Sequence, residues 1–305
     1  MARPRVTGDR NRRLFEKCSN FKAVFSKHRR SDGELESKQI QGAPCVIAHT
    51  YRALISAVGY FKYNHPTPLL LRGQTACFGL MHASLHRAAP FPSDANIEAF
   101  LRRYRKALNV DTTSVSKLST EPLLQHYGIR TRWLDVVDSV PHALFFATHQ
   151  LVKSPLKTGH LTYVPSRAEY GILYLLDAGA LTATRRNGAT VHGCWRGSQG
   201  IDLVDLRKLK PSLALRPHAQ HGLLLRDTAG RVDLWDRLLA RIAVPTASAR
   251  QWISSTAFAP EEFFPHRTWD GVFGHLLSPK FSKFLAAENV SGAWGDIMRF
   301  DFHDT

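Results

Sequence analysis

The sequence predicts an α/β (α+β) protein in which a mixed central sheet is flanked by helices. Two observations point to this class. Short apolar runs recur along the 305 residues, and amphipathic or apolar helical patterns stand between them. The hydrophobic content of 44% and the chain length are sufficient to bury a sizeable core in one or two domains.

Several runs have the length and composition of buried strands. Residues 69–71 are three leucines, and Gly73 ends this run just after Arg72. Residues 170–177, with the sequence YGILYLLD, form a continuous apolar run that is typical of a central strand. Further strands are expected at residues 201–206, 213–215, 222–225 and 242–245.

Helical patterns lie between these runs. Residues 97–108 predict an amphipathic helix that buries Ile97, Phe100 and Tyr104. Residues 142–151 predict a buried helix, with Asp138 or Ser139 as its cap and Pro141 in its first turn. Further helices are expected at residues 45–61, 232–239, 247–255 and 279–287, the last capped by Ser278.

Three segments follow from the composition. Residues 1–42 are a basic arm and linker, in which Phe15, Phe21 and Phe25 are interleaved with arginines and lysines. The arm is either one short amphipathic helix or a loosely docked segment. Residues 43–290 form the main domain, with a polar insertion at 153–169, a turn at 185–188 and a glycine-rich loop at 191–200. Residues 291–305 form a polar tail.

Charge is the strongest bulk signal. The chain carries 41 Lys and Arg against 25 Asp and Glu, and the difference is +16. Such a field attracts nucleic acid, although it also serves solubility or an acidic partner protein. The polar face of the helix at 97–108 is our candidate for phosphate contacts. It carries Arg102, Arg103, Arg105 and Lys106.

Other classes of protein are not indicated. No apolar run approaches the roughly 18 residues of a membrane helix, and the charged N-terminus lacks the apolar region of a secretory signal. The four cysteines form no CxxC pair, so neither a zinc ribbon nor a redox motif is expected. We therefore expect a cytoplasmic protein in a reducing compartment, with no membrane contact and no metal.

Residues 123–148 concentrate the chemistry. Gln125, His126 and Tyr127 precede a turn at Gly128, and the buried helix follows soon afterwards. Polar side chains on a turn that is fixed to a core helix are typical of a functional site. The candidates after the turn are Thr131, Arg132, Trp133 and Asp135.

This stretch resembles the most specific block of the FRG domain family, QHYG-x-x-TR-x-LD followed by an apolar helix. The Phe-Arg-Gly signature that gives the family its name reads Leu71-Arg72-Gly73 here. Further matches are residues 171–177, the AQ-x-G block at 219–222, and an FP and a DG pair at 264–265 and 270–271. The resemblance extends over roughly residues 46–287.

The FRG layout in turn resembles the ADP-ribosyltransferase fold, which implies NAD as the substrate. Arg72 fits the arginine of the first core strand, and Thr131 fits the later Ser/Thr motif. Gln220 stands at the position where many members carry a glutamate. Since glutamine cannot act as a carboxylate, this departure argues against transfer to protein more than against transfer to nucleic acid.

The chemistry of NAD cleavage suggests roles for these residues. Arg72 or Arg132 would hold the pyrophosphate, and Tyr127 or Trp133 would stack on the nicotinamide. Asp135 would lie near the developing positive charge, and His126 would accept a proton. Gly73 would allow close approach of the ligand. Structural roles for the two aromatic rings, and a buried pair between Arg132 and Asp135, are the alternatives.

The resemblance therefore predicts an NAD-dependent ADP-ribosyltransferase-like toxin or phage-defence effector. Its target would be nucleic acid, most plausibly RNA, and an acidic antitoxin would keep it silent. Two alternatives remain open. One is a nucleic-acid-binding module without activity, and the other is a metal-dependent nuclease that uses Asp135, Asp138 and nearby histidines.

Overall fold

The structure is a computed structural model of the chain. It describes residues 35–87, 92–108, 117–186, 189–198, 200–209, 214–228, 233–254, 258–287 and 294–303. Of the basic arm and linker expected over residues 1–42, residues 1–34 lie outside the described residues.

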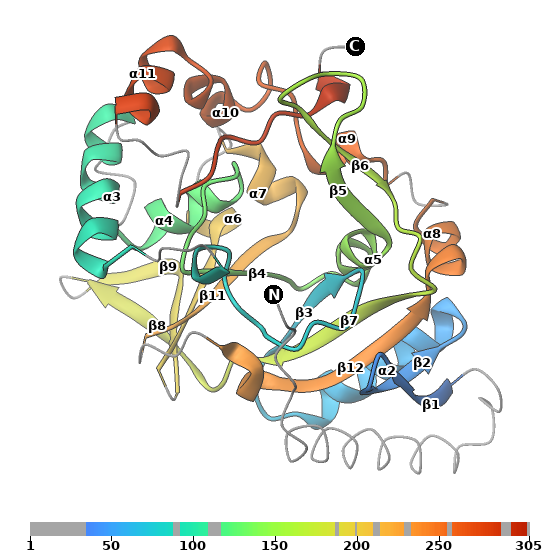
Figure 1. Cartoon of the computed structure of the whole chain (residues 1–305). Helices are drawn as coiled ribbons and strands as arrows, with labels where there is room; N and C mark the ends of the chain where they lie inside the picture. The colour runs from blue at the N-terminus through green and yellow to red at the C-terminus, as the bar shows by residue number, and fades with distance from the viewer. Residues whose placement is uncertain are drawn as a thin grey trace.

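A ten-stranded mixed sheet forms the centre of the molecule (Figure 1). The strand order is β1-β2-β12-β7-β3-β4-β11-β10-β9-β8, and β5 and β6 form a separate hairpin. Neighbouring strands are antiparallel except for the parallel pair β2 and β12. The strands are β1 (Leu35–Ile40), β2 (Ala43–Ala48), β3 (Leu69–Gln74), β4 (Leu134–Val137), β5 (His149–Lys153), β6 (Leu161–Pro165), β7 (Tyr170–Asp177), β8 (Leu181–Arg186), β9 (Ala189–Gly197), β10 (Ile201–Asp205), β11 (Gly222–Asp227) and β12 (Leu238–Pro245).

Helices cover the two halves of this sheet separately. The helices α2, α5 and α8 share one apolar cluster with β2, β12, β7 and β3. The helices α3, α4, α10 and α11 contribute to a second cluster with β9, β10 and β11 (Figure 1). The helices are α2 (Tyr51–Asn64), α3 (Asp94–Leu108), α4 (Lys117–Gln125), α5 (Val140–Thr148), α6 (Leu206–Leu209), α7 (Leu215–Ala219), α8 (Thr246–Ser254), α9 (Pro260–Phe263), α10 (Gly271–Leu276) and α11 (Pro279–Ala287), with 3₁₀ turns η1 (Leu85–Arg87), η2 (Leu234–Arg237) and η3 (Asp301–His303). The mixed sheet with flanking helices confirms the predicted fold class.

The two halves of the sheet join at a fork. Strands β3 and β4 pair only through Leu71 and Val137. Beyond that point Arg72, Gly73 and Gln74 continue to pair with β7, whereas Asp135 pairs with Leu224 of β11. The pairing between β3 and β4 therefore ends at this point, next to Arg72 of β3 and close to Asp135 of β4.

Helix α5 is positioned by two glycines of the sheet. Gly73 of β3 and Gly171 of β7 both lie against the backbone of α5, at Ala143 and Ala147. A side chain at either glycine would push the helix away from the sheet. The apolar sequence of α5 also buries Leu144 and Phe145, and the Phe145 ring stacks on Phe263 of α9.

Two expectations near the start of the chain are wrong. The segment 35–40, expected to be linker, is the edge strand β1, which pairs with β2. The helix expected at 45–61 is instead strand β2 followed by α2. The strand β2 is buried along its whole length, and a continuous apolar run of that kind cannot be told from a helix by its periodicity. Thr50 caps α2 by accepting from the Ala53 N–H at 3.1 Å.

Other expectations require correction further along the chain. The helix expected at 142–151 ends at Thr148, and residues 149–151 already belong to strand β5. The polar insertion at 153–169 contains β6, which pairs with β5, and the glycine-rich loop at 191–200 lies largely in β9. The strand expected at 213–215 is not found. Residue 213 lies outside the described residues, and Leu215 is the first residue of helix α7. Pro217 suits that helix better than a central strand. The helix expected at 232–239 is the short turn η2, followed by β12.

The described part of the C-terminal tail packs on the domain. Met298 N donates to the carbonyl of Tyr127 at 2.8 Å, and Arg130 N donates to the carbonyl of Trp294 at 2.7 Å. Phe300 is fully buried in the cluster around α5. The two hydrogen bonds hold the C-terminal segment against the turn at Gly128. None of the described helices has the length and apolar character that a membrane crossing needs.

Candidate functional site at the fork of the sheet

A cavity of about 310 Å³ lies at the fork between β3 and β4. Its size is near the lower end of the range for small-molecule pockets. Polar groups from three separate parts of the chain converge on it. They include Arg72, Gln74, His126, Asp135, His149 and Gln220.

Arg72 spans the fork. Its Nη1 donates to the backbone carbonyl of Asp135 at 2.6 Å, which takes the place of the next ladder bond between β3 and β4. With the Gln74 amide oxygen turned towards it, that oxygen accepts from Nε at 3.2 Å and from Nη2 at 3.3 Å. Burial lowers the pKa of Arg72, the charge of Asp135 opposes this, and the charge of Arg87 adds to it. The guanidinium is thus held at the cavity by neutral oxygens.

Asp135 presents its carboxylate to the same cavity. Leu134 and Val136 belong to one apolar cluster, so the alternation of β4 directs Asp135 to the other face. Within the described chain this carboxylate accepts no hydrogen bond and forms no ion pair. Arg72 donates to the backbone oxygen of Asp135 and not to its carboxylate. A carboxylate without a protein partner can interact with a bound cation or donor.

His126 and Gln220 form a buried pair beside Asp135. The Gln220 Nε2 donates to the carbonyl of Phe263 at 2.9 Å, so its oxygen is the group that faces His126 Nδ1 at 2.9 Å. The proton of the neutral imidazole therefore lies on Nδ1. Burial lowers the pKa of His126, which favours this neutral form, while Asp135 and Gln220 act in the opposite direction.

The second nitrogen of His126 is a buried acceptor at the cavity. Among the described residues, Nε2 has no hydrogen-bond partner. The missing side chain of Gly222 gives the ring its space, since a Cβ there would lie 2.7 Å from Nε2. An unpartnered buried acceptor is costly, and a ligand that donates to it would remove that cost.

Four aromatic side chains that were not predicted as site residues also line the cavity. They are Phe146 of α5, Tyr163 of β6, Phe264 after α9 and Phe78 after β3. Burial and the nearby charge of Asp135 raise the pKa of Tyr163, so its hydroxyl stays protonated. The only signal for Tyr163 is its alternating position in the hairpin, and this signal is lost when the segment is taken for a polar insertion.

Tyr127 does not line the cavity, which corrects the expectation that it stacks on a ligand. Its ring is buried in the second apolar cluster and stacks on Phe273. Its hydroxyl donates to both oxygens of the buried Asp270, at 3.0 and 2.8 Å. Burial and Asp270 raise the pKa of Tyr127. Asp270 also caps α10 by accepting from Phe273 N, so Tyr127 joins the turn to that helix.

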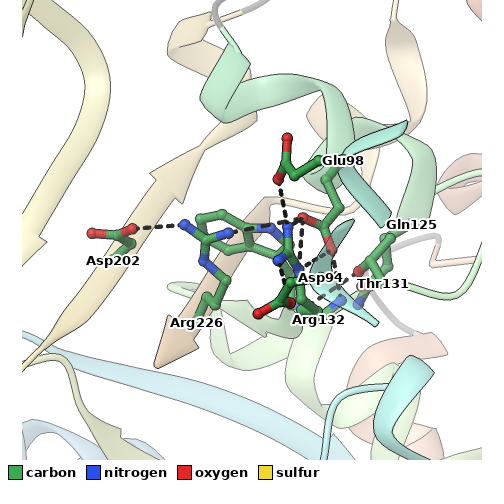
Figure 2. A network of polar contacts seen from close by, with 9 residues as sticks. Asp94, Glu98, Gln125, Thr131, Arg132, Asp202 and Arg226 are labelled. Atoms are coloured by element: carbon green, nitrogen blue, oxygen red, sulfur yellow. Dashed lines mark hydrogen bonds and ion pairs between the residues drawn. The ribbon is translucent and has the colours of Figure 1, made fainter. Parts of the chain in front are cut away.

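Arg132 is committed to a structural network, which corrects its expected role as a phosphate ligand. Figure 2 shows its guanidinium among the acidic groups of α3, with Arg226 and Asp202 alongside. Arg132 pairs with Glu121 at 2.7 Å, Asp94 at 2.9 Å and Glu98 at 3.1 Å. Asp135 is not among its partners, so the expected buried pair is also absent from the described contacts.

Thr131 and Trp133 belong to the same structural side of the block, and neither lines the cavity. The Thr131 hydroxyl donates to Gln125 Oε1 and accepts from Trp133 N at 3.2 Å. Trp133 is buried with the Arg226 guanidinium 4.6 Å from its ring centre. The pattern thus divides into residues that line the cavity, Gln125, His126 and Asp135, and residues that hold the turn.

The remaining candidates have simple placements. Gly73 lines the cavity, but its missing side chain makes room for α5. Arg102, Arg103 and Lys106 are exposed on α3, whereas Arg105 is half-buried and its Nε donates to the Leu101 carbonyl at 3.1 Å. Asp138 pairs with Arg207 and His221 at the surface. In the described ranges, no three His, Cys, Asp or Glu side chains are grouped to hold a metal.

Comparison with known proteins gives one match. Residues 67–155 match the family model of the FRG domain. This segment is shorter than the resemblance expected from the sequence, and it contains Arg72, His126 and Asp135 but not Gln220. Searches of the curated proteins and of the solved structures found no match. The similarity to the FRG domain is therefore supported for the part of the chain that builds most of the cavity.

Proposed function

We propose that this chain is an NAD-dependent ADP-ribosyltransferase-like enzyme that modifies nucleic acid, with RNA as the leading acceptor. The observation that carries the proposal is that Arg72 and Asp135 line one cavity at the fork of the sheet. A fixed guanidinium suits the pyrophosphate of NAD. A carboxylate without a protein partner suits the cationic nicotinamide ring and the oxocarbenium-like ribose that forms when the ring leaves.

The other wall residues fit the same reaction. The ring of Phe146, Tyr163 or Phe264 would stack on the nicotinamide, the role that the sequence had suggested for Tyr127 or Trp133. The bond between the nicotinamide nitrogen and the ribose C1′ breaks, and nicotinamide leaves with the bonding electrons. An acceptor oxygen or nitrogen then bonds to C1′, and its proton passes to His126 Nε2. Gln220 fixes the tautomer that leaves this nitrogen free to accept.

The setting proposed with this activity is a toxin or phage-defence effector in the cytoplasm, silenced by an acidic antitoxin. The net charge of +16 supports both an RNA acceptor and an acidic inhibitor. Since the residue paired with His126 is an amide, Asp135 is the only carboxylate among the described residues that line the cavity. This is a reason to prefer nucleic acid over protein as the acceptor.

The test is incubation of the full chain with NAD labelled in the adenylate phosphate, together with separate pools of RNA, DNA and protein. We expect release of nicotinamide and transfer of label to RNA. Asp135→Asn keeps the shape of the side chain and should reduce the rate by about 10² or more, because one charge at the transition state is lost. Circular dichroism should show an unchanged fold for this variant.

Binding is tested separately by thermal unfolding. NAD at about 100 times its Kd should stabilise the wild type by about 2.7 kcal/mol, and Arg72→Lys should weaken this effect because a lysine cannot make the bidentate contact. Absence of both a thermal shift and nicotinamide release would contradict the proposal. Steeply salt-dependent RNA binding without any effect of NAD would instead indicate a binding module.

A further inference from the structure

A second cavity, of about 280 Å³, adjoins the first at the fork. The two cavities share Arg72, Gln74 and Phe78. The second cavity is lined mainly by the segment after β3, and also by Arg87 of η1, which does not border the first cavity. Its wall includes Met81 and Leu134, which belong to a third apolar cluster together with buried residues of β7, β10 and β11, whereas the first cavity has Phe146 and Tyr163, which pack on the first apolar cluster. Arg72 thus lies between two compartments.

The ionisable groups of the second cavity suit an anion. The described residues that line it include Arg72, Arg87 and His82 but no Asp or Glu. Arg87 is exposed and forms no ion pair within the part of the chain that the structure describes. Two guanidinium groups that border one cavity repel each other, and an anion between them would replace this repulsion with two charge-assisted hydrogen bonds.

An uncovered aromatic ring stands beside these cations. Phe78 is 49% exposed although it lines both cavities, and Leu80 is 37% exposed. The segment that carries them is fixed at both ends: Phe78 N donates to Tyr174 Oη at 3.0 Å, and Met81 N donates to Asp233 Oδ1 at 2.9 Å. The exposure of the ring is therefore a property of an anchored segment.

We propose that the second cavity binds a nucleotide, with its base against Phe78 and its phosphate on Arg87 and Arg72. Stacking on an aromatic side chain beside a guanidinium is the general way in which single-stranded nucleic acid is held without sequence readout. The choice of a nucleotide rests on the proposed function. Two sources share this chemistry, namely the adenylate half of NAD and a nucleotide of the acceptor strand, and the experiment below distinguishes them.

Cys77 supplies a local reporter, because it lines the second cavity and not the first. Its Sγ lies 3.9 Å from Cys45 Sγ, and this contact lowers the pKa of the Cys77 thiol. The reduced full chain is treated with iodoacetamide, and alkylation of the Cys77 peptide is followed by mass spectrometry. Cys194, buried in the other half of the molecule, reports any general opening of the fold.

We expect 5′-AMP at ten times its Kd to slow alkylation of Cys77 about tenfold, because only the unoccupied fraction reacts. Arg87→Ala and Phe78→Ala should each raise the Kd for 5′-AMP about tenfold or more, so the same concentration of AMP should protect Cys77 much less. Arg167→Ala removes the same charge from an exposed loop that lines neither cavity, and it should leave protection unchanged.

Two further arms identify the source of the nucleotide. Protection by NAD but not by a short single-stranded RNA assigns the cavity to the adenylate half of NAD. Protection by the RNA but not by NAD assigns it to the acceptor strand. If AMP, NAD and RNA all leave the alkylation of Cys77 unchanged, the inference is wrong, even where Asp135-dependent release of nicotinamide is observed. Protection without any release of nicotinamide would leave this inference standing while the proposed function fails.

Discussion

Gly73 and Ala143 are in contact through their backbones. A Cβ built on Gly73 would lie 1.8 Å from the carbonyl oxygen of Ala143 and 2.8 Å from Ala147 N. Neither atom can move without moving α5, because Ala143 and Ala147 belong to that helix and are fully buried. The glycine next to Arg72 therefore sets the distance between helix and strand at the floor of the cavity.

Gly73→Ala should destabilise the fold by about 3 kcal/mol or more, since overpacking against a rigid backbone usually costs about 1–3 kcal/mol and this approach is unusually close. Gly59→Ala is the matched control. Gly59 lies exposed in α2 with nothing within 4 Å of its Cβ position, so alanine should be neutral or stabilising by up to about 1 kcal/mol. Urea unfolding measures both. Equal stability of the two variants would contradict the proposed packing role.

Neighbouring residues show how far the sequence alone could lead. The leucines of β3 and the apolar run of β7 identify buried strands, because a strand that is buried on both faces shows itself in composition. His126 and Asp135 could be selected as candidates because their side chains carry chemistry. Their neighbours Tyr127, Arg132 and Trp133 looked equally suitable, yet they face the other side of the turn. The direction of a side chain in a turn depends on tertiary packing, here on Asp270 and Glu121.

The aromatic wall could not be predicted for a different reason. Phe146, Tyr163 and Phe264 are far apart in the sequence, and each is an ordinary core residue in its own segment. Only the placement of the β5–β6 hairpin and of α9 beside α5 brings them to one cavity (Figure 1). The same applies to Phe78, whose exposure follows from the anchoring of its segment.

Arg132 offers a second prediction. Arg132→Ala should destabilise the fold by about 3 kcal/mol, because the buried Glu121 loses its main partner. The value is at the lower end of the range for buried pairs because Arg226 remains 3.8 Å from Glu121. The double variant with Glu121→Gln should be less destabilised than the sum of the single ones. If Arg132→Ala has normal stability but is no longer stabilised by NAD, Arg132 binds the ligand and is not a structural residue.

The buried histidines predict a loss of stability in acid. Burial, helped by His221 and Arg207, lowers the pKa of His142 to about 4, although Asp138 and the Ala219 carbonyl act in the opposite direction. Above a pH of about 6.5 the ring is neutral in both states and contributes no pH dependence. Below that pH the unfolded chain takes up a proton that the folded chain does not, so stability falls as the pH drops towards 4.

The slope for this one histidine is up to about 1.4 kcal/mol per pH unit between these limits. Burial lowers the pKa of His126 and His149 in the same direction, so their slopes add to it. Urea unfolding of the wild type at pH 7, 6 and 5 measures the total. His142→Gln should be less stable at pH 7 but should show a shallower slope. If the free energy of unfolding changes equally with pH in the variant and the wild type, His142 is not a source of the acid instability.

The basic face of α3 gives the last prediction. Arg102, Arg103 and Lys106 are exposed, and α3 lies on the opposite side of the molecule from the β5–β6 hairpin (Figure 1). Reversal of these charges to glutamate should weaken RNA binding and reduce its salt slope by about 1 for each phosphate that the helix no longer neutralises. The NAD shift should not change, because none of these residues lines either cavity at the fork.

The control reverses Lys153 and Lys157 on the β5–β6 hairpin, which are also exposed. If RNA follows a defined path over α3, the hairpin variant should bind RNA with a nearly unaltered salt slope. If both variants lose affinity in proportion to their charge change, the attraction comes from the net charge of +16 as a whole. In that case α3 is an ordinary solvated helix, and the acceptor strand must be positioned by contacts closer to Arg72.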